Sequence, residues 1–92
     1  MDQEIFEKIE TYLHAHKKMT LATASAEGQA MAHTVQYVSE GNTVFFFTKP
    51  GQRKAENIRN NPRVGFTVDQ DYEDWSKIQG VQIQGEARIL ED

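Results

Sequence analysis

The chain has 92 residues, and its 14 acidic and 10 basic side chains give a formal net charge of −4 at pH 7. This length allows one domain, residues 1–92, without a second hydrophobic core, and the negative charge argues against general binding to nucleic acid. The absence of cysteine excludes disulfides, thiolate nucleophiles and Cys-based metal sites. The acidic N-terminal segment indicates no signal peptide, and the longest apolar run, residues 44–47, is too short to cross a bilayer. We therefore expect a cytoplasmic protein that has no membrane partner.

The first predicted element is an amphipathic helix over residues 3–16. Its apolar side chains recur at helical spacing: Ile5, Phe6, Ile9, Tyr12 and Leu13. Asp2 is expected to cap the helix, because an aspartate at this position accepts hydrogen bonds from the free amides of the first turn. Histidines and lysines at residues 14–18 are typical of the last turn.

Three strands are predicted next, because the hydrophobic period changes from that of a helix to two. They cover residues 19–24, 30–38 and 43–48. The turns between them, which contain Gly28 and the sequence SEGN, are short, so the strands are expected to form an antiparallel meander. The third strand is apolar on both faces and is therefore expected to lie in the centre of the sheet.

A short helix over residues 52–60 is predicted after the break at Pro50 and Gly51, and Pro62 ends it, since the residue before a proline avoids the helical region. Two more strands follow, over residues 64–69 and 81–90. They flank an acidic loop around Trp75. Gly85, in the middle of the last strand, indicates a bulge or a close approach of another backbone. The whole pattern predicts a small antiparallel barrel or curled sheet.

The segment of residues 48–64 concentrates positive charge, with a net charge of +4. Its basic residues are Lys49, Arg53, Lys54, Arg59 and Arg63, and its one acid is Glu56. A hydroxyl at Thr48, a turn at Gly51 and a helix that opens with Arg53 and Lys54 could together hold an anion, and phosphate is the natural guest. The nucleotide-binding pattern GxxxxGK[ST] is absent. On residue type alone, a solvated basic helix face is the favoured interpretation.

Other candidate chemistry is weak. His14 and His16 lie on different faces of a helix and His33 stands alone on a strand, so we expect no metal site. The acids near residue 71 lack the spacing of a calcium loop. No residue stands out as an acid, base or nucleophile, so any catalysis would belong to a cofactor.

Three stretches, in order along residues 19–90, resemble the pyridoxamine-phosphate-oxidase-like flavin-binding split barrels. They are LATASAEGQAMAHTVQYVSEGNTVFFFT, KPGQRKAENIRNNPRVGFTV and GVQIQGEARIL, and the most specific motif is T-x-x-x-x-R-K-A-x-x-[IL]-x-x-N-P-R-V. The resemblance implies a mainly β, α+β fold: an antiparallel split β-barrel of Greek-key type. The N-terminal helix would occupy residues 1–17 and the barrel residues 18–92, with a short helix between strands 3 and 4 and the last family strand missing. It also implies a homodimer with FMN at the subunit interface.

Particular residues take roles by the same resemblance. It implies that Thr48, Arg53 and Lys54 hold the flavin phosphate, with Gln52 in the place of a serine that often assists. The strand that runs along the flavin ring, mainly through backbone groups, would contain His33, Thr34 and Val35. A glutamine near the start of the fifth strand, Gln82 or Gln79, would face the flavin. Val38 stands where the true oxidases carry a substrate-binding lysine, so the resemblance does not extend to pyridoxamine-phosphate oxidation.

The function that the resemblance implies is that of an FMN-binding oxidoreductase that transfers hydride or electrons to an unknown substrate. One alternative is a non-catalytic flavin or haem binding or sensor protein, for which His33 would be the haem ligand to test. A second is a deazaflavin-dependent reductase of the same fold. Nucleic acid is not an expected partner.

Overall fold

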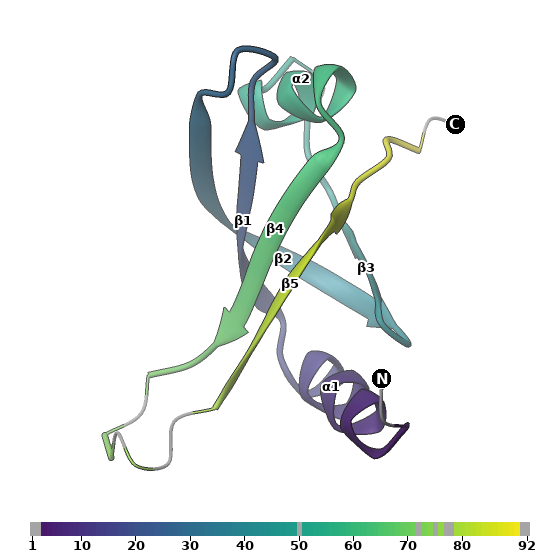
Figure 1. Ribbon diagram of the computed structural model, residues 1–92, viewed down its shortest axis with the longest axis vertical. Helices are drawn as coiled ribbons and strands as arrows, with labels where there is room; N and C mark the ends of the chain where they lie inside the picture. The colour runs from purple at the N-terminus through teal and green to yellow at the C-terminus, as the bar shows by residue number, and fades with distance from the viewer. Residues whose placement is uncertain (1–2, 50, 72, 75, 77–78, 91–92) are drawn as a thin grey trace.

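A computed structural model describes residues 3–49, 51–71, 73–74, 76 and 79–90. The elements, drawn in Figure 1, are α1 (Gln3–Ala15), β1 (Lys18–Ala24), β2 (Ala30–Glu40), β3 (Thr43–Phe46), α2 (Arg53–Asn60), β4 (Arg63–Asp69) and β5 (Gly80–Glu86). Their order agrees with the order predicted from the sequence. The predicted cap Asp2, the break at Pro50 and the loop residue Trp75 lie outside the described residues.

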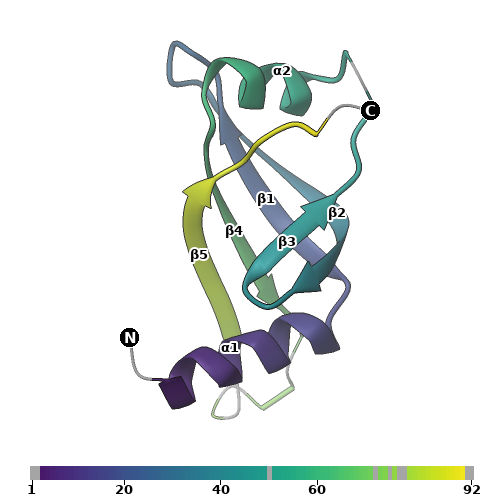
Figure 2. The same cartoon turned by 90° about the vertical axis from the view of Figure 1, so that its right-hand side faces the viewer.

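The strands form one curled antiparallel sheet in the order β3-β2-β1-β4-β5. The first three strands form the predicted meander, and β4 then pairs with the free side of β1. Figures 1 and 2 show that α1 closes one end of this half-barrel and α2 lies at the other. This architecture confirms the predicted fold class.

The predicted central place of the third strand is wrong, because β3 forms an edge of the sheet and β1 its centre. Although β3 is apolar on both faces, the chain itself covers only one of them. Phe46 points to the half-buried inner side, whereas Phe45 is 42% and Phe47, just after the strand, is 86% exposed. The outer apolar face is therefore left open to solvent.

The hydrophobic core lies on the concave side of the sheet. Its buried side chains come from α1 and three strands: Leu13, Met19, Leu21, Tyr37, Phe66 and Val68. In β1 every second residue is buried, as the period of two predicts for a strand with one covered face. Within the described ranges, no helix combines the length and the apolar character that a membrane crossing requires.

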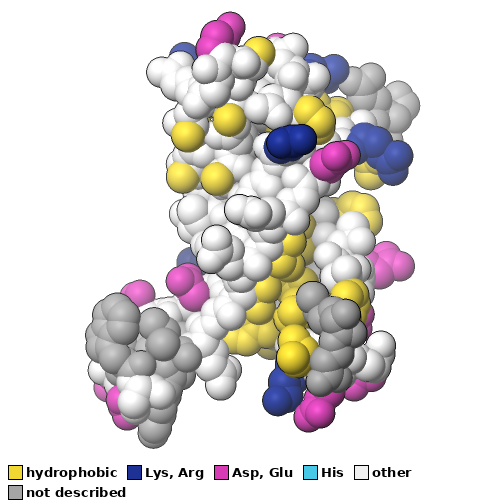
Figure 3. Space-filling model, viewed as in Figure 1, with side chains coloured by type: hydrophobic (Ala, Val, Ile, Leu, Met, Phe, Trp, Pro, Cys, Tyr) yellow, Lys and Arg dark blue, Asp and Glu magenta, His cyan; other side chains and the backbone are white. Residues whose placement is uncertain are grey.

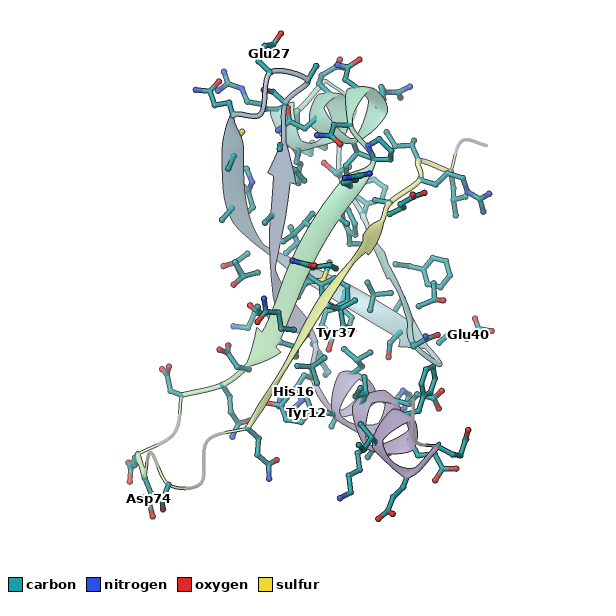
Figure 4. All side chains as sticks on the ribbon, in the orientation of Figure 1. Tyr12, His16, Glu27, Tyr37, Glu40 and Asp74 are labelled. Carbon is teal, nitrogen blue, oxygen red and sulfur yellow. The ribbon has the colours of Figure 1, made fainter. Side chains whose placement is uncertain are left out.

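The C-terminal end of α1 is linked to the sheet and to the segment before β5 by two tyrosine hydroxyls, and a histidine packs beside them. The Tyr37 hydroxyl donates to the Leu13 carbonyl at 2.7 Å, and burial raises the pKa of Tyr37. His16 Nδ1 donates to the Tyr12 carbonyl at 2.8 Å while the two rings stack, and the Tyr12 hydroxyl donates to the Gln79 carbonyl at 3.1 Å. Figure 4 shows Tyr12 and His16 together beside this end of the sheet.

The last strand differs from its prediction in two ways. It ends at Glu86, not at Leu90, because its ladder partner β4 begins at Arg63; one further bond, from Ala87 N to the Pro62 carbonyl, closes the pairing. Gly85 pairs one to one with Val64, so there is no bulge. A Cβ at Gly85 would meet no atom within 4 Å, so the predicted close approach is absent within the described part of the chain.

Candidate functional site

The chain between β3 and α2 forms a tight corner, here called the α2 corner and defined as residues 48–49 and 51–54. Gly51 has a φ of +86°, a conformation that glycine adopts readily and that lets the chain reverse. Gln52 is the N-cap residue of α2, and its carbonyl accepts a hydrogen bond from Glu56 N at 3.1 Å. The Gln52 side chain makes no capping bond to the helix amides, so it is free to interact with its neighbours.

Two donors in the α2 corner meet at one oxygen atom. The Thr48 hydroxyl donates to Gln52 Oε1 at 3.0 Å, and the Lys54 ammonium donates to the same oxygen at 2.9 Å. Thr48 and Lys54 are half-buried, whereas Arg53 is exposed beside them. The structure therefore brings Thr48, Gln52 and Lys54 together, and it places Arg53 next to them in sequence at the start of α2.

The helix that carries these residues is fixed to the sheet by a buried amide. Asn57 is 5% exposed, and its Nδ2 donates to Thr23 Oγ1 at 3.0 Å and to Met31 Sδ at 3.6 Å. Ala55 and Ile58 bury their side chains on the same side of α2. Sequence reasoning missed Asn57, although residues 54, 57, 58 and 61 follow helical spacing and this stripe contains Ile58.

The predicted ring-contact segment of β2 presents its side chains on two faces. Thr34 is exposed on the outer face, whereas His33 and Val35 are half-buried on the inner one, where they pair with the core residues Leu21 and Met19. His33 Nδ1 is buried and has no hydrogen-bond partner in the described part of the structure. A planar group against the outer face would therefore meet Thr34 and the backbone, not the imidazole.

Gln82 lies on the same outer face as Thr34, but two strands, β1 and β4, separate the two residues. The strand register places Thr34, Thr20, Thr67 and Gln82 in one row across β2, β1, β4 and β5. At about 4.8 Å per strand, the two ends of this row are roughly 14 Å apart. The neighbouring row consists of small residues and one glutamine: Ala32, Ala22, Gly65 and Gln84. The side chains at the middle of the outer face are thus uncharged, and most of them are small.

Two hollows flank β3. One, of about 550 Å³, is lined by Lys17, Gln36, Tyr37, Val38 and Phe45–Phe47. The other, of about 710 Å³, opens into the concave side between β3 and the segment after β5 and extends to Thr48. Figure 3 shows hydrophobic side chains along the hollow beside β5. Val38, which is 68% exposed, adds an apolar side chain at the position where the resemblance expects a lysine in true oxidases.

The acidic loop provides no arrangement for a metal ion among the described residues, where no group of three or more His, Asp or Glu side chains gathers. The Asp74 carboxylate accepts hydrogen bonds from the hydroxyl of Ser76 at 2.7 Å and from its amide at 3.0 Å. Both bonds lower the pKa of Asp74, and the bond from the Ser76 hydroxyl has the larger effect. The Asp74 carboxylate thus forms a local turn with Ser76.

Comparison with known proteins identifies the family. The model of the family described as pyridoxamine 5'-phosphate oxidase matches residues 5–92, nearly the whole chain. The chain belongs to the pyridoxamine 5'-phosphate oxidase family. This finding confirms the resemblance that was read from the three sequence stretches.

Two curated proteins are similar to this family member in sequence. It is 43% identical over 63 residues to a pyridoxine/pyridoxamine 5'-phosphate oxidase of Alcanivorax borkumensis, a match that covers 67% of the chain and 30% of that protein. It is 31% identical over 87 residues to general stress protein 26 of Bacillus subtilis, which covers 95% of the chain and 61% of that protein. The chain thus spans less than two thirds of either relative.

Solved structures support the fold of this family member. A conserved hypothetical protein of Mycobacterium tuberculosis matches with a TM-score of 0.85 and 28% identity, over 100% of the chain and 55% of that protein. A FAD-binding protein of Mesorhizobium loti matches with a TM-score of 0.63 and 28% identity, over 80% and 51%. HutZ, a haem storage protein of Vibrio cholerae, matches with a TM-score of 0.79 and 20% identity, over 94% and 63%. This last likeness shows the fold alone.

Proposed function

We propose that the protein binds FMN, with the flavin phosphate held at the α2 corner, and that it acts as a flavin-dependent oxidoreductase. The observation that carries the proposal is the meeting of the Thr48 hydroxyl and the Lys54 ammonium at a single oxygen, Gln52 Oε1. Donors that converge in this way can serve an oxygen of a phosphate equally well, because phosphate oxygens are strong acceptors. Arg53, exposed beside them, adds a guanidinium.

The chemical surroundings of the corner favour an anion. Residues 48–54 contain three cations and no acid, and the corner stands at the start of α2, where the helix dipole presents its positive end. Membership of a family described as an oxidase of a phosphorylated compound agrees with this electrostatic preference. The FAD-binding protein of Mesorhizobium loti, at 28% identity, supports a flavin as the cofactor class.

The redox chemistry would belong to the flavin, which transfers hydride or electrons when bound. This chain would anchor the phosphate and offer the ring the backbone of β2 and the uncharged outer face, where Thr34 and Gln82 are exposed. His33 and Val35 would contribute mainly through their backbone, since their side chains face inwards.

We propose in addition that the protein is a homodimer and that the exposed apolar surface around β3 is its interface. Val38 and Phe45 stand opposite each other on one face of the β2–β3 pair, and Phe47 is 86% exposed nearby. Large apolar side chains that lie together on an exposed surface commonly mark a site where another protein binds. A second copy that covers this surface would also close the hollow of about 550 Å³ that these residues line.

The test of FMN binding is the double variant Arg53→Ala, Lys54→Ala. Wild-type protein is expected to bind FMN and to show a flavin absorption spectrum, and the double variant is expected to lose FMN because the phosphate loses both of its charged partners. Full FMN occupancy of the double variant would refute the phosphate site. A haem (Soret) band in the protein as purified would assign haem instead of flavin, and mass spectrometry of the bound chromophore would separate FMN from a deazaflavin.

A further inference from the structure

Gln52 is the acceptor on which the donors of the α2 corner depend. The Thr48 hydroxyl reaches it from the end of β3 and the Lys54 ammonium from the first turn of α2, at 3.0 and 2.9 Å. Both donors come from the residues to which the flavin phosphate is assigned above. A phosphate oxygen that used these donors would therefore have to replace Gln52 Oε1 as their partner.

The chemistry of the amide makes such a replacement possible. An amide oxygen is neutral, so it accepts the hydrogen bond of Lys54 without cancelling the positive charge of the ammonium. Phosphate offers a charge-assisted bond to the same donors, and such bonds are stronger than bonds to a neutral acceptor. Since the Gln52 side chain does not cap α2, it can turn without releasing a helix amide.

We propose that Gln52 is a specificity-determining residue that competes with phosphate for Thr48 and Lys54. In this role Gln52 sets how strongly an anion must bind in order to displace the amide from the two donors. The side chain therefore controls the part of the cofactor's affinity that depends on the phosphate. This inference rests on the proposed FMN site and assigns its specificity to a single side chain.

Two substitutions of similar length change the competition in opposite directions. Gln52→Glu replaces the neutral acceptor by a carboxylate, which forms an ion pair with Lys54 and repels phosphate. Gln52→Met removes the acceptor and leaves Thr48 and Lys54 free to bond with phosphate. If Gln52 were a direct donor to the phosphate, both substitutions would weaken binding, so the methionine variant separates the two roles.

The experiment measures dissociation constants for FMN and riboflavin by quenching of flavin fluorescence, since the two ligands differ only by the phosphate. The ratio of riboflavin to FMN dissociation constants is the readout. We expect Gln52→Glu to lower this ratio at least about tenfold and Gln52→Met to raise it about fivefold, the factor that corresponds to one neutral hydrogen bond. Gln3→Glu, at the exposed start of α1 on the opposite end of the molecule (Figure 1), is the charge-matched control and should leave the ratio unchanged.

A fall of the ratio in both Gln52 variants would make Gln52 a direct phosphate ligand and overturn the competition. A ratio that matches the Gln3→Glu control in both variants would also overturn it, because Gln52 would then have no part in phosphate binding. A wild-type protein that binds FMN no more tightly than riboflavin would refute the proposed phosphate site itself, and the role of Gln52 with it. Circular dichroism of each variant confirms that the fold is retained.

Discussion

His33 has a ring nitrogen, Nδ1, that is buried and without a hydrogen-bond partner in the described part of the structure. Leaving a buried polar atom unpaired costs about 1–3 kcal/mol. We predict that His33→Leu raises the free energy of unfolding by about 1 kcal/mol, because leucine brings no polar atom to this site beside Leu21. Urea denaturation measures the change.

The matched control for His33 is His16, a histidine whose two ring nitrogens are both hydrogen-bonded, to the Tyr12 carbonyl and to Gln70 Oε1. His16→Leu should lower the free energy of unfolding, since it breaks both bonds. A loss of stability in His33→Leu of the same size as in His16→Leu would contradict the interpretation that His33 Nδ1 is unsatisfied.

The residues of the α2 corner show how far sequence reasoning extends for single side chains. The resemblance implied that Thr48, Arg53 and Lys54 hold a phosphate with the help of Gln52, and the structure shows Thr48 and Lys54 hydrogen-bonded to Gln52, while the phosphate role stays a prediction. It did not reveal that Gln52 Oε1 accepts from both others, because this depends on side-chain rotamers that a one-dimensional pattern does not encode. Asn57 was missed for a related reason: a polar residue on a helix is expected outside the core unless its partner, here Thr23, is known.

The α2 helix depends on Asn57 for its attachment to β1. We predict that Asn57→Ala lowers the free energy of unfolding by about 2 kcal/mol, because Thr23 loses its partner and a small cavity remains. The same change should weaken FMN binding, since the α2 corner moves with the helix. Denaturant unfolding and FMN titration of the variant measure the two effects.

Asn60→Ala is the control for this helix, because Asn60 is exposed and its Nδ2 donates along the helix, to the Glu56 carbonyl. Its effect on stability should stay within about 0.5 kcal/mol. Equal losses of FMN affinity in the Asn57 and Asn60 variants would show that helix stability in general, and not the anchor to β1, supports the corner.

Among the elements, the two helices and the sequence of strands along the chain followed from periodicity and turn residues. The edge position of β3 in the sheet and the end of β5 did not. A strand with two apolar faces is usually central, and β3 is an edge strand with Phe45 exposed. The pattern records that a face is apolar and not what covers it. The end of β5 depends on where β4 begins, which is a long-range feature.

At the level of the whole molecule, the half-barrel has an apolar surface on each side of β3. We propose that a second copy of the chain covers the outer surface. We predict that the wild-type protein is a dimer and that Phe45→Ser together with Phe47→Ser makes it a monomer with weakened FMN binding. Sedimentation velocity, in the presence and absence of FMN, gives the oligomeric state.

Ile5→Ser tests whether any exposed apolar residue would have this effect, because Ile5 is 51% exposed but belongs to α1 and not to the β2–β3 pair. This variant should remain a dimer. A wild-type monomer at all concentrations, or a dimer that survives the double phenylalanine substitution, would contradict the proposed interface.

FMN binding itself is tested most directly by thermal melting of the wild-type protein with saturating FMN and, in parallel, with the same concentration of riboflavin. A ligand that binds the native state and not the unfolded chain stabilises the fold, so FMN bound as proposed should stabilise the protein by about 2.7 kcal/mol at 100 times its dissociation constant. We therefore predict a clear rise of the melting temperature with FMN and a smaller rise with riboflavin, which lacks the group that Thr48, Arg53 and Lys54 are proposed to hold. An unchanged melting temperature at saturating FMN would contradict the proposal.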